Sequence, residues 1–347
     1  MKKKYLVLAN GKIFEGVSFG YDGEACGEIV FNTAAVGYTE ALTDPSYYGQ
    51  ILIQTFPLIG NSGMNTEDFE SESPRLFGYV VREYCDEPSN FRSEMTVDEF
   101  LKKNKIPGIS GIDTRELTEI IRDSGVMNAC ITDEVTNQTM QTLNDFSIVK
   151  ALESTAAKKT VYPAEGEEKF NVVMIDYGAL KSTIKQFTSK GCKITALPYT
   201  ASADEVLALN PDGIILSQGA GDPAENAACI ETVKALAGKK PIFGIGLGHQ
   251  IFALAMGAKT EKMLFGHHGA SQPVKCIECG KVLITSQNHG YTVVNDTLPK
   301  DAVVTHFNVN DATVEGVKYP ALGAFTLQFN MDASDKFCKM MEEKACH

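Results

Sequence analysis

The feature that most constrains the fold of this chain is a glycine-rich turn at residues 243–250, which read Phe-Gly-Ile-Gly-Leu-Gly-His-Gln. A short apolar strand, Pro241–Phe243, enters the turn, and a helical stretch runs from His249 to Met256. This is the layout of a nucleophile elbow, in which small flanking residues let the chain turn sharply beneath one reactive side chain. The apex here is Gly246, which has no side chain. The sequence therefore predicts the fold of a hydrolase site without its nucleophile.

Strands and helices alternate four times along the second half of the chain. The apolar runs at 172–175, 193–197, 213–216 and 241–243 are each followed by a helical stretch. Alternation at this spacing predicts an α/β domain with a doubly wound, mostly parallel sheet covered on both faces. Ligand sites in such sheets lie at the carboxyl ends of the strands. The elbow is one of these ends, and Asp176–Gly178 and Ser217–Pro223 are others.

The first half of the chain is organised differently, with short β-type runs separated by turn-forming residues. Thr96 with Glu99, and Asp113 with Glu116, have the spacing of capping boxes ahead of two later helices. This order predicts an α+β domain. Residues 152–170 are polar and lack periodicity, which is typical of a linker. We therefore expect an N-terminal domain at 1–151, a linker at 152–170 and a second domain at 171–347.

The composition restricts the partners and the compartment. Hydrophobic residues make up 44% and charged residues 22%, as in a soluble globular protein, and the net charge is -12. This charge argues against nucleic acid or an anionic membrane as a partner. The apolar run Tyr5–Ala9 is shorter than a signal-peptide core, and no run is long enough to span a membrane. Nine scattered cysteines favour reduced thiols in the cytoplasm.

Two glycine-rich loops lie at strand ends, Gly219–Gly221 and Gly244–Gly248. Bare backbone N–H groups in such loops resemble an oxyanion hole or an anion cradle. The alternative is a pair of tight turns that need glycine for backbone geometry alone. A dinucleotide-binding loop is excluded, because the third glycine of its pattern falls at His249.

Two patterns suggest a metal, but neither is complete. His267 and His268 are adjacent, and neighbouring histidines rarely point at one ion. Cys276 and Cys279 have the spacing of half a zinc knuckle, but no second cysteine pair matches them. We expect these cysteines to flank a hairpin turn at Gly280, and we predict no metal site.

Several motifs together resemble the small subunit of carbamoyl-phosphate synthase nearly end to end. The second half resembles the class I (triad) glutamine amidotransferase domain. The motifs of the first half are Phe31–Thr33, Gly37–Glu40, Leu42–Tyr47, Ile59–Asn61, Ser89–Arg92, Ile112–Thr118 and Asn128–Ile131. Those of the second half are Gly248–Gln250, Phe265–Gly269 and Thr285–Tyr291. The first-half motifs separate this family from other amidotransferases.

The resemblance implies a partner. In the family, an elbow cysteine attacks the amide carbon of glutamine, and a histidine with an acidic partner activates it. The released ammonia passes to a large synthetase subunit that consumes ATP and bicarbonate. The resemblance thus implies a heterodimer with a large subunit that holds ATP and magnesium, and no cofactor in this chain. The product would serve pyrimidine or arginine synthesis.

The resemblance also shows where this chain departs from the family. The cysteine position is Gly246, the histidine position Asn330 and the glutamate position Asp332. The family's Asn-Gly-Pro-Gly-Asp-Pro loop here begins Gln218-Gly219-Ala220, and its Asn-His pair is Ser271-Gln272. Glycine cannot be a nucleophile, and asparagine has no proton that titrates near neutral pH. No catalytic group is intact. Among the other cysteines, Cys229 lies within a helix, and Cys338 and Cys346 lie past the Asn330 segment.

Glutamine binding is a separate question from glutamine hydrolysis. The family's substrate contacts map onto residues of suitable type at Ser46, Gly219, Gly221, Leu247, Gln250, Asn288, Gly290 and Tyr291. We expect a pocket that holds glutamine without cleaving it, with extra room where the cysteine is missing. The expected function is a small subunit that supports or modulates ammonia-dependent carbamoyl phosphate synthesis. A non-catalytic glutamine-sensing or scaffolding module and a glutaminase with unusual chemistry are the alternatives.

Overall fold

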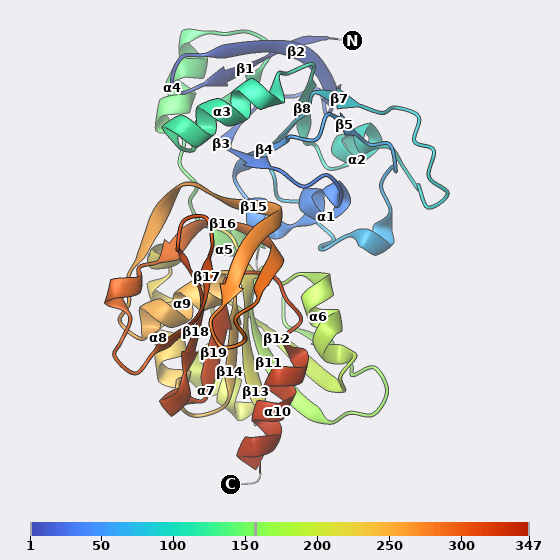
Figure 1. The fold of residues 1–347 in the computed structure, drawn as a ribbon. Helices are drawn as coiled ribbons and strands as arrows, with labels where there is room; N and C mark the ends of the chain where they lie inside the picture. The colour runs from blue at the N-terminus through green and yellow to red at the C-terminus, as the bar shows by residue number, and fades with distance from the viewer. Residues whose placement is uncertain (1, 156–157, 346–347) are drawn as a thin grey trace. The chain divides into compact units, whose positions relative to one another are not determined.

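The computed structural model describes residues 2–155 and 158–345 (Figure 1). The chain forms two compact units. Unit 1 contains the chain through Ala151 together with Leu264–Gly269. Unit 2 contains Leu152–Met263 and the chain from Ala270 onward.

Unit 1 is built on a closed β-barrel, which leaves no strand edge unpaired. The strand order is β1-β2-β8-β6-β4-β3-β9. Alternate residues point inward, so Ile51 and Ile53 of one strand pack with Ile29 and Ile109 of others in a buried cluster. The strands are β1 (Lys3–Leu8), β2 (Ile13–Gly20), β3 (Ala25–Asn32), β4 (Gln50–Gln54), β6 (Gly78–Val80), β8 (Pro107–Ser110) and β9 (Met127–Thr132).

The helices of unit 1 begin where the sequence predicts caps. Thr96 and Glu99 form a capping box at the start of α2 (Val97–Lys103). The Asp113 side chain accepts hydrogen bonds from two backbone N–H groups of α3 (Thr114–Ser124), and Gly125 ends that helix with φ 86°. The other helices are α1 (Tyr38–Thr43), α4 (Asn137–Asp145) and α5 (Ala151–Thr155), with short 3-10 helices η1 (Pro45–Tyr47) and η2 (Thr66–Asp68); β5 (Leu58–Ile59) pairs with β7 (Glu83–Tyr84).

Unit 2 contains a ten-stranded sheet in the order β10-β12-β11-β13-β14-β19-β18-β16-β15-β17. The pairs from β12 to β19 are parallel, and β18 joins β19 antiparallel. The first strands are β10 (Thr160–Tyr162), β11 (Phe170–Tyr177), β12 (Cys192–Pro198), β13 (Gly213–Gly219) and β14 (Ile242–Ile245). The others are β15 (Thr260–Cys276), β16 (Val282–Val293), β17 (Val303–Asn308), β18 (Val314–Tyr319) and β19 (Ala324–Leu327).

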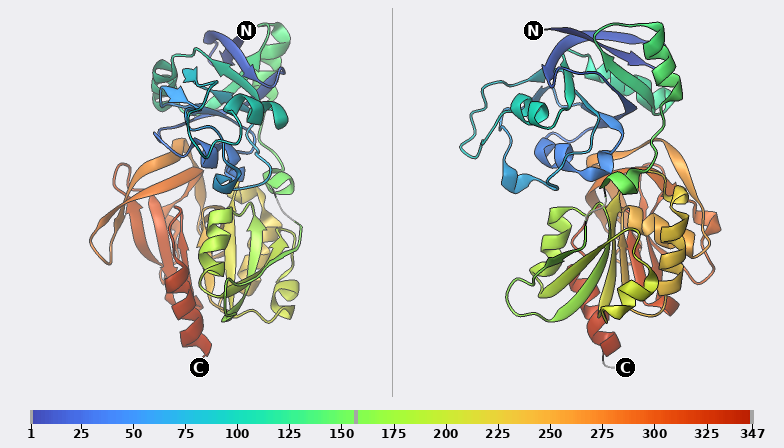
Figure 2. Two further views of the ribbon diagram at one scale, coloured as in Figure 1. Left: turned by 90° about the vertical axis from the view of Figure 1, so that its right-hand side faces the viewer. Right: turned by 180° about the vertical axis from the view of Figure 1, so that it is seen from behind.

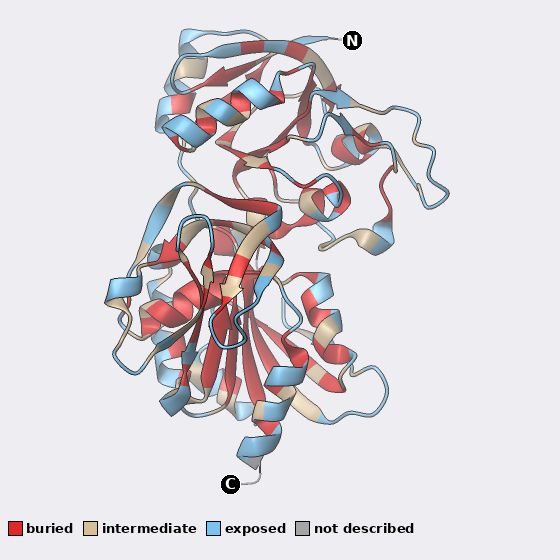
Figure 3. Cartoon of the chain, viewed as in Figure 1, coloured by how far each residue is buried: buried red, intermediate tan, exposed pale blue. Residues whose placement is uncertain are grey.

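Helices cover both faces of this sheet (Figure 2). On β11, Val173 and Ile175 pack in one cluster with residues of α7, α8 and α9, whereas Val172 and Met174 pack in another with residues of α6 and α10. The central strands are therefore buried on both sides, as Figure 3 shows. The predicted doubly wound α/β arrangement is confirmed for the parallel strands from β12 to β19. The sheet as a whole is mixed, because β10, β15, β16, β17 and β18 enter antiparallel pairs. The helices are α6 (Lys181–Thr188), α7 (Ala203–Ala208), α8 (Ala227–Leu236), α9 (Leu247–Ala255) and α10 (Ser334–Ala345), with 3-10 helices η3 (Pro223–Glu225), η4 (Asn295–Thr297) and η5 (Pro320–Leu322).

Two polar segments contain strands of unit 2. Part of 152–170, predicted as a linker, belongs to unit 2, because Leu152 is in its core and β10 pairs antiparallel with β12. Polar composition there is compatible with an exposed edge strand. The polar residues 287–291 lie inside β16. Their polar groups bond to one another and to neighbours, since His289 Nε2 lies 2.9 Å from Gln287 Oε1 and Gln287 Nε2 lies 3.0 Å from Glu315 Oε2.

The expectation of reduced thiols fails at one pair. Cys26 and Cys130 form a disulfide, because they face each other in the register of β3 and β9 with 4.1 Å between their Cα atoms. Because 104 residues separate the two cysteines, no local pattern in the sequence indicates that they pair. The free cysteines of the described chain are Cys85, Cys192, Cys229, Cys276, Cys279 and Cys338, and Cys346 lies outside the described residues. Among the described helices, none is long and apolar enough to cross a membrane.

Candidate functional site

The chain turns sharply between β14 and α9 at Gly246, which has φ 58° and ψ -116°. This backbone conformation is unfavourable for residues with a side chain, and nucleophile elbows hold their reactive residue in such strain. The Gly246 N–H extends the ladder to β19 with a 2.9 Å bond to the Leu327 carbonyl oxygen. Its own carbonyl oxygen accepts from the N–H of His249, 3.1 Å away, in the first turn of α9.

The flanking glycines of the elbow are required by packing. A Cβ on Gly244 would lie 2.9 Å from both the Gly248 carbonyl oxygen and Thr326 Cγ2. A Cβ on Gly248 would meet the backbone carbonyl of Leu216, with the carbonyl carbon 2.6 Å away. Gly246 differs, because its nearest neighbour would be Gln218 Cγ at 3.3 Å. Of the three elbow glycines, only Gly246 would accept a Cβ without a clash with backbone atoms.

Gln218 occupies the space beside that apex. Its side chain is buried, and its Nε2 donates to Thr183 Oγ1 at 2.7 Å and to Asn330 Oδ1 at 3.0 Å. The sequence predicts extra room at the missing cysteine, and the structure places the Gln218 side chain on one side of that room, against Gly246. The sequence shows that residue 218 departs from the family's asparagine, but not that the longer side chain reaches Asn330.

Asn330 and Asp332 stand at the positions of the family's histidine and acid. The Asn330 N–H donates to the Ser286 carbonyl oxygen at 3.0 Å, and its side-chain oxygen accepts from Gln218. Asp332 is exposed, and its Oδ1 accepts from the N–H of Ser334 at 3.0 Å, at the start of α10. The Asp332 carboxylate thus caps a helix. At the histidine position, Asn330 makes a hydrogen bond between two neutral amides, which cannot transfer a proton as an imidazole does.

The predicted glutamine contacts are divided between the two units. Ser46 belongs to unit 1, where its N–H donates to Asp44 Oδ1 at 2.8 Å at the start of η1. In unit 2, Gln250 is buried on α9, and its Nε2 donates to the Tyr291 carbonyl oxygen at 2.8 Å and to Gln328 Oε1 at 2.9 Å. The amide group of Gln250 thus ties α9 to β16. The other predicted contacts, Gly219, Gly221, Leu247, Asn288 and Gly290, also lie in unit 2.

The loop after β13 owes its shape to its glycines. A Cβ on Gly219 would lie 2.6 Å from the Tyr177 carbonyl oxygen and 2.8 Å from Leu247 Cδ2. Gly221 has φ 91°, in the region that favours glycine. Next to this loop, burial raises the pKa of Asp176, although the N–H groups of Gly178 and Ala179 bond to its carboxylate. Packing and backbone geometry therefore account for Gly219 and Gly221 without a ligand.

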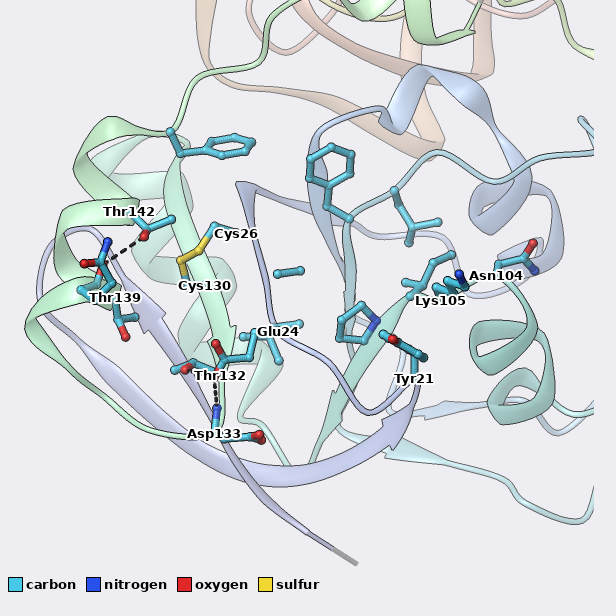
Figure 4. A pocket seen from close by; sticks show the side chains of 18 of the residues that line it. Tyr21, Glu24, Cys26, Asn104, Lys105, Cys130, Thr132, Asp133, Thr139 and Thr142 are labelled. Atoms are coloured by element: carbon cyan, nitrogen blue, oxygen red, sulfur yellow. Dashed lines mark hydrogen bonds between the residues drawn. A yellow bond between two sulfur atoms is a disulfide. The ribbon is translucent and has the colours of Figure 1, made fainter.

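A separate cavity of about 940 Å³ lies within unit 1 (Figure 4). The Cys26–Cys130 disulfide forms part of its wall. Nearby, Glu24 Oε1 accepts from Thr132 Oγ1 at 2.6 Å and from the Asp133 N–H at 2.9 Å. The described residues that line the cavity include none of the predicted glutamine contacts. The cavity is therefore not the glutamine pocket.

Comparison with known proteins decides the family. Residues 6–131 match the family model "Carbamoyl-phosphate synthase small chain, CPSase domain", and residues 173–330 match "Glutamine amidotransferase class-I". The carbamoyl phosphate synthase pyrimidine-specific small chain of Bacillus subtilis is 46% identical over 352 residues, which cover 98% of this chain and 96% of that protein. This chain belongs to the carbamoyl-phosphate synthase small chain family.

Other relatives agree with this family. The carbamoyl phosphate synthase small chain of Streptococcus pneumoniae serotype 4 is 46% identical over 358 residues, covering 99% of this chain and 98% of that protein. Among solved structures, a glutamine amidotransferase from Thermotoga maritima is 19% identical with a TM-score of 0.39, covering 51% of this chain and 82% of that chain. That structural likeness is too low to bear on function. The small chain family implies a large-subunit partner.

Proposed function

We propose that this chain is a carbamoyl-phosphate synthase small subunit that does not hydrolyse glutamine. The observation that carries the proposal is at the elbow apex. Gly246 supplies no nucleophile, and the buried amide of Gln218 fills the adjacent space and bonds to Asn330 at 3.0 Å. Without a sulfur atom no thioester forms, and without an imidazole no group moves a proton to the leaving ammonia.

The expected loss of activity is large. In a comparable triad hydrolase, removal of the nucleophile lowers turnover by about a million-fold. Oxyanion donors and binding alone leave roughly 10³–10⁴ over the uncatalysed rate by the same precedent. The neutral Gln218–Asn330 pair cannot replace the missing proton transfer, because neither amide titrates near neutral pH.

Without hydrolysis, the functions that remain for this chain are association with a large subunit and support of carbamoyl phosphate synthesis there. In this proposal the small chain forms a cytoplasmic complex with a large subunit that binds ATP and magnesium, and synthesis uses free ammonia. The family match over residues 6–131 supports the association, since this domain distinguishes small chains from other amidotransferases. Glutamine remains a proposed ligand through the residues that match the family's contacts. Its amide end would have to displace Gln218, which lowers the affinity.

Two measurements test the proposal. The purified protein should release ammonia from glutamine no faster than buffer, and it should copurify with a carbamoyl-phosphate synthase large subunit. Turnover well above the buffer rate that is lost in N330A would refute the absence of hydrolysis. A failure to bind any large subunit would instead refute the assignment as a working subunit and favour the scaffolding alternative.

A further inference from the structure

The hairpin turn between β15 and β16 holds two thiols in a compact, hydrogen-bonded loop. Cys276 is the last residue of β15, and Cys279 follows three residues later in the turn. The turn is closed by a 2.9 Å bond from the Cys276 N–H to the Lys281 carbonyl oxygen and a 3.0 Å bond from the Gly280 N–H to the Cys276 carbonyl oxygen. Gly280 has φ 68°, which lets the chain reverse directly after the second cysteine.

The two sulfur atoms have different surroundings. Cys276 is 9% exposed, and its Sγ accepts a hydrogen bond from the Cys279 N–H at 3.3 Å. Cys279 is exposed. A hydrogen bond from the Cys276 side chain lowers the pKa of the Cys279 thiol, whereas burial raises the pKa of Cys276. The Lys281 ammonium group also favours the Cys279 thiolate. An accessible thiol with a lowered pKa, next to a second thiol that can resolve a mixed disulfide, favours thiol–disulfide exchange.

We propose that Cys279 and Cys276 form a thiol–disulfide exchange site for low-molecular-weight disulfides such as oxidised glutathione. The Cys279 thiolate attacks one sulfur of the small disulfide, and one small thiolate leaves. The Cys276 thiolate then attacks Cys279 Sγ in the mixed disulfide, and the second small thiolate leaves. The protein dithiol loses two electrons and two protons to become a disulfide, and the small disulfide is reduced to two thiols.

A second thiol pair in unit 2 provides an internal comparison. Cys192 Sγ and Cys338 Sγ lie 3.8 Å apart. Cys192 is fully buried in β12 and Cys338 is half-buried, so a small disulfide reaches neither thiol as readily as the exposed Cys279. In both pairs the two thiols interact with each other, and of the two pairs only the hairpin pair includes an exposed thiol. The exchange site does not involve Gly246, and it stands whether or not glutamine is hydrolysed.

Mass spectrometry after treatment with oxidised glutathione tests this site. In the full-length protein, the peptide containing both cysteines should lose two hydrogen atoms and regain them with dithiothreitol. In C276S, no second thiol can attack the mixed disulfide at Cys279. A glutathione adduct should therefore accumulate on Cys279. In C279S, Cys276 should stay unmodified under the same conditions.

The two variants also keep the test independent of folding. Both changes lie in or beside a surface turn, and unchanged circular dichroism melting curves would show intact folds. Absence of a Cys276–Cys279 disulfide in the unaltered protein would overturn the proposal. So would an adduct that forms on Cys276 in C279S as fast as on Cys279 in C276S, because the order of attack would then have no structural basis.

Discussion

Three glycine-to-alanine changes test whether Gly246, unlike the flanking elbow glycine Gly248, has space for a Cβ. A Cβ at Gly290, in β16, would have no heavy atom within 4 Å. At Gly246 it would have its nearest neighbour at 3.3 Å, but on a backbone with φ 58°. At Gly248 it would lie 2.6 Å from the Leu216 carbonyl carbon, and backbone atoms cannot yield as a flexible side chain does.

These contacts give a different free-energy change at each position. G290A should stabilise the fold by about 0.4–1 kcal/mol, because alanine lowers the entropy of the unfolded chain. G246A has the same stabilising entropy effect, but it also adds backbone strain of about 1–3 kcal/mol. The net change expected is a destabilisation of up to about 2.6 kcal/mol. G248A forces backbone movement and should destabilise by about 3 kcal/mol or more.

Urea unfolding followed by circular dichroism measures these changes, since the chain has no tryptophan. Hydrogen exchange in peptides from α9 would assign the effect to unit 2. If G246A is as harmless as G290A, the elbow backbone is not strained. If G246A is as damaging as G248A, the apex has no room for a side chain, and the comparison with a nucleophile elbow fails.

The remaining predictions concern the degenerate site and its surroundings. G246C alone should hydrolyse glutamine at the background rate. The combined variant G246C/N330H/Q218N should exceed that rate by at least about a hundred-fold, which is a small part of what a nucleophile supplies. Equal rates in the two proteins would contradict the role given to Asn330 and Gln218. In calorimetry, Q218A should bind glutamine more tightly than the unaltered protein, and no heat with either protein at millimolar glutamine would remove glutamine as a ligand. Burial lowers the pKa of His249 to about 3. As the pH falls, the unfolded chain takes up this proton near pH 6.5 and the folded chain only near pH 3. The folded state should therefore lose about 1.4 kcal/mol per pH unit between these two values and no more below them. H249N should lack this part of the acid dependence, and an unchanged slope would contradict the buried neutral imidazole.

Much of the fold follows from local signals in the sequence. Caps at Thr96, Asp113 and Ser202 mark helix starts because their side chains satisfy backbone N–H groups within three residues. The continuous apolar run of β11 is typical of a strand that is buried on both faces. Such signals depend only on residues close in the sequence, so they can be recognised without knowledge of tertiary contacts.

The features that the sequence did not predict depend on distant partners. The polar residues of β16 are accommodated in a strand because Gln287 Nε2 donates a hydrogen bond to Glu315 Oε2 on the neighbouring strand β18. The Cys26–Cys130 bond depends on the register of two barrel strands. At the candidate site, the sequence predicts the loss of the nucleophile at Gly246 from the resemblance to the family. It does not predict the contact between Gln218 and Asn330, which are 112 residues apart.

The most direct test of the central claim is carbamoyl phosphate synthesis by this chain reconstituted with a large subunit, measured with ammonia and with glutamine as the nitrogen source. We expect synthesis from ammonia and none above background from glutamine, and G246C/N330H/Q218N assayed alongside should gain some glutamine-dependent synthesis. Glutamine-dependent synthesis by the unaltered chain, at a rate comparable with that from ammonia, would contradict the account.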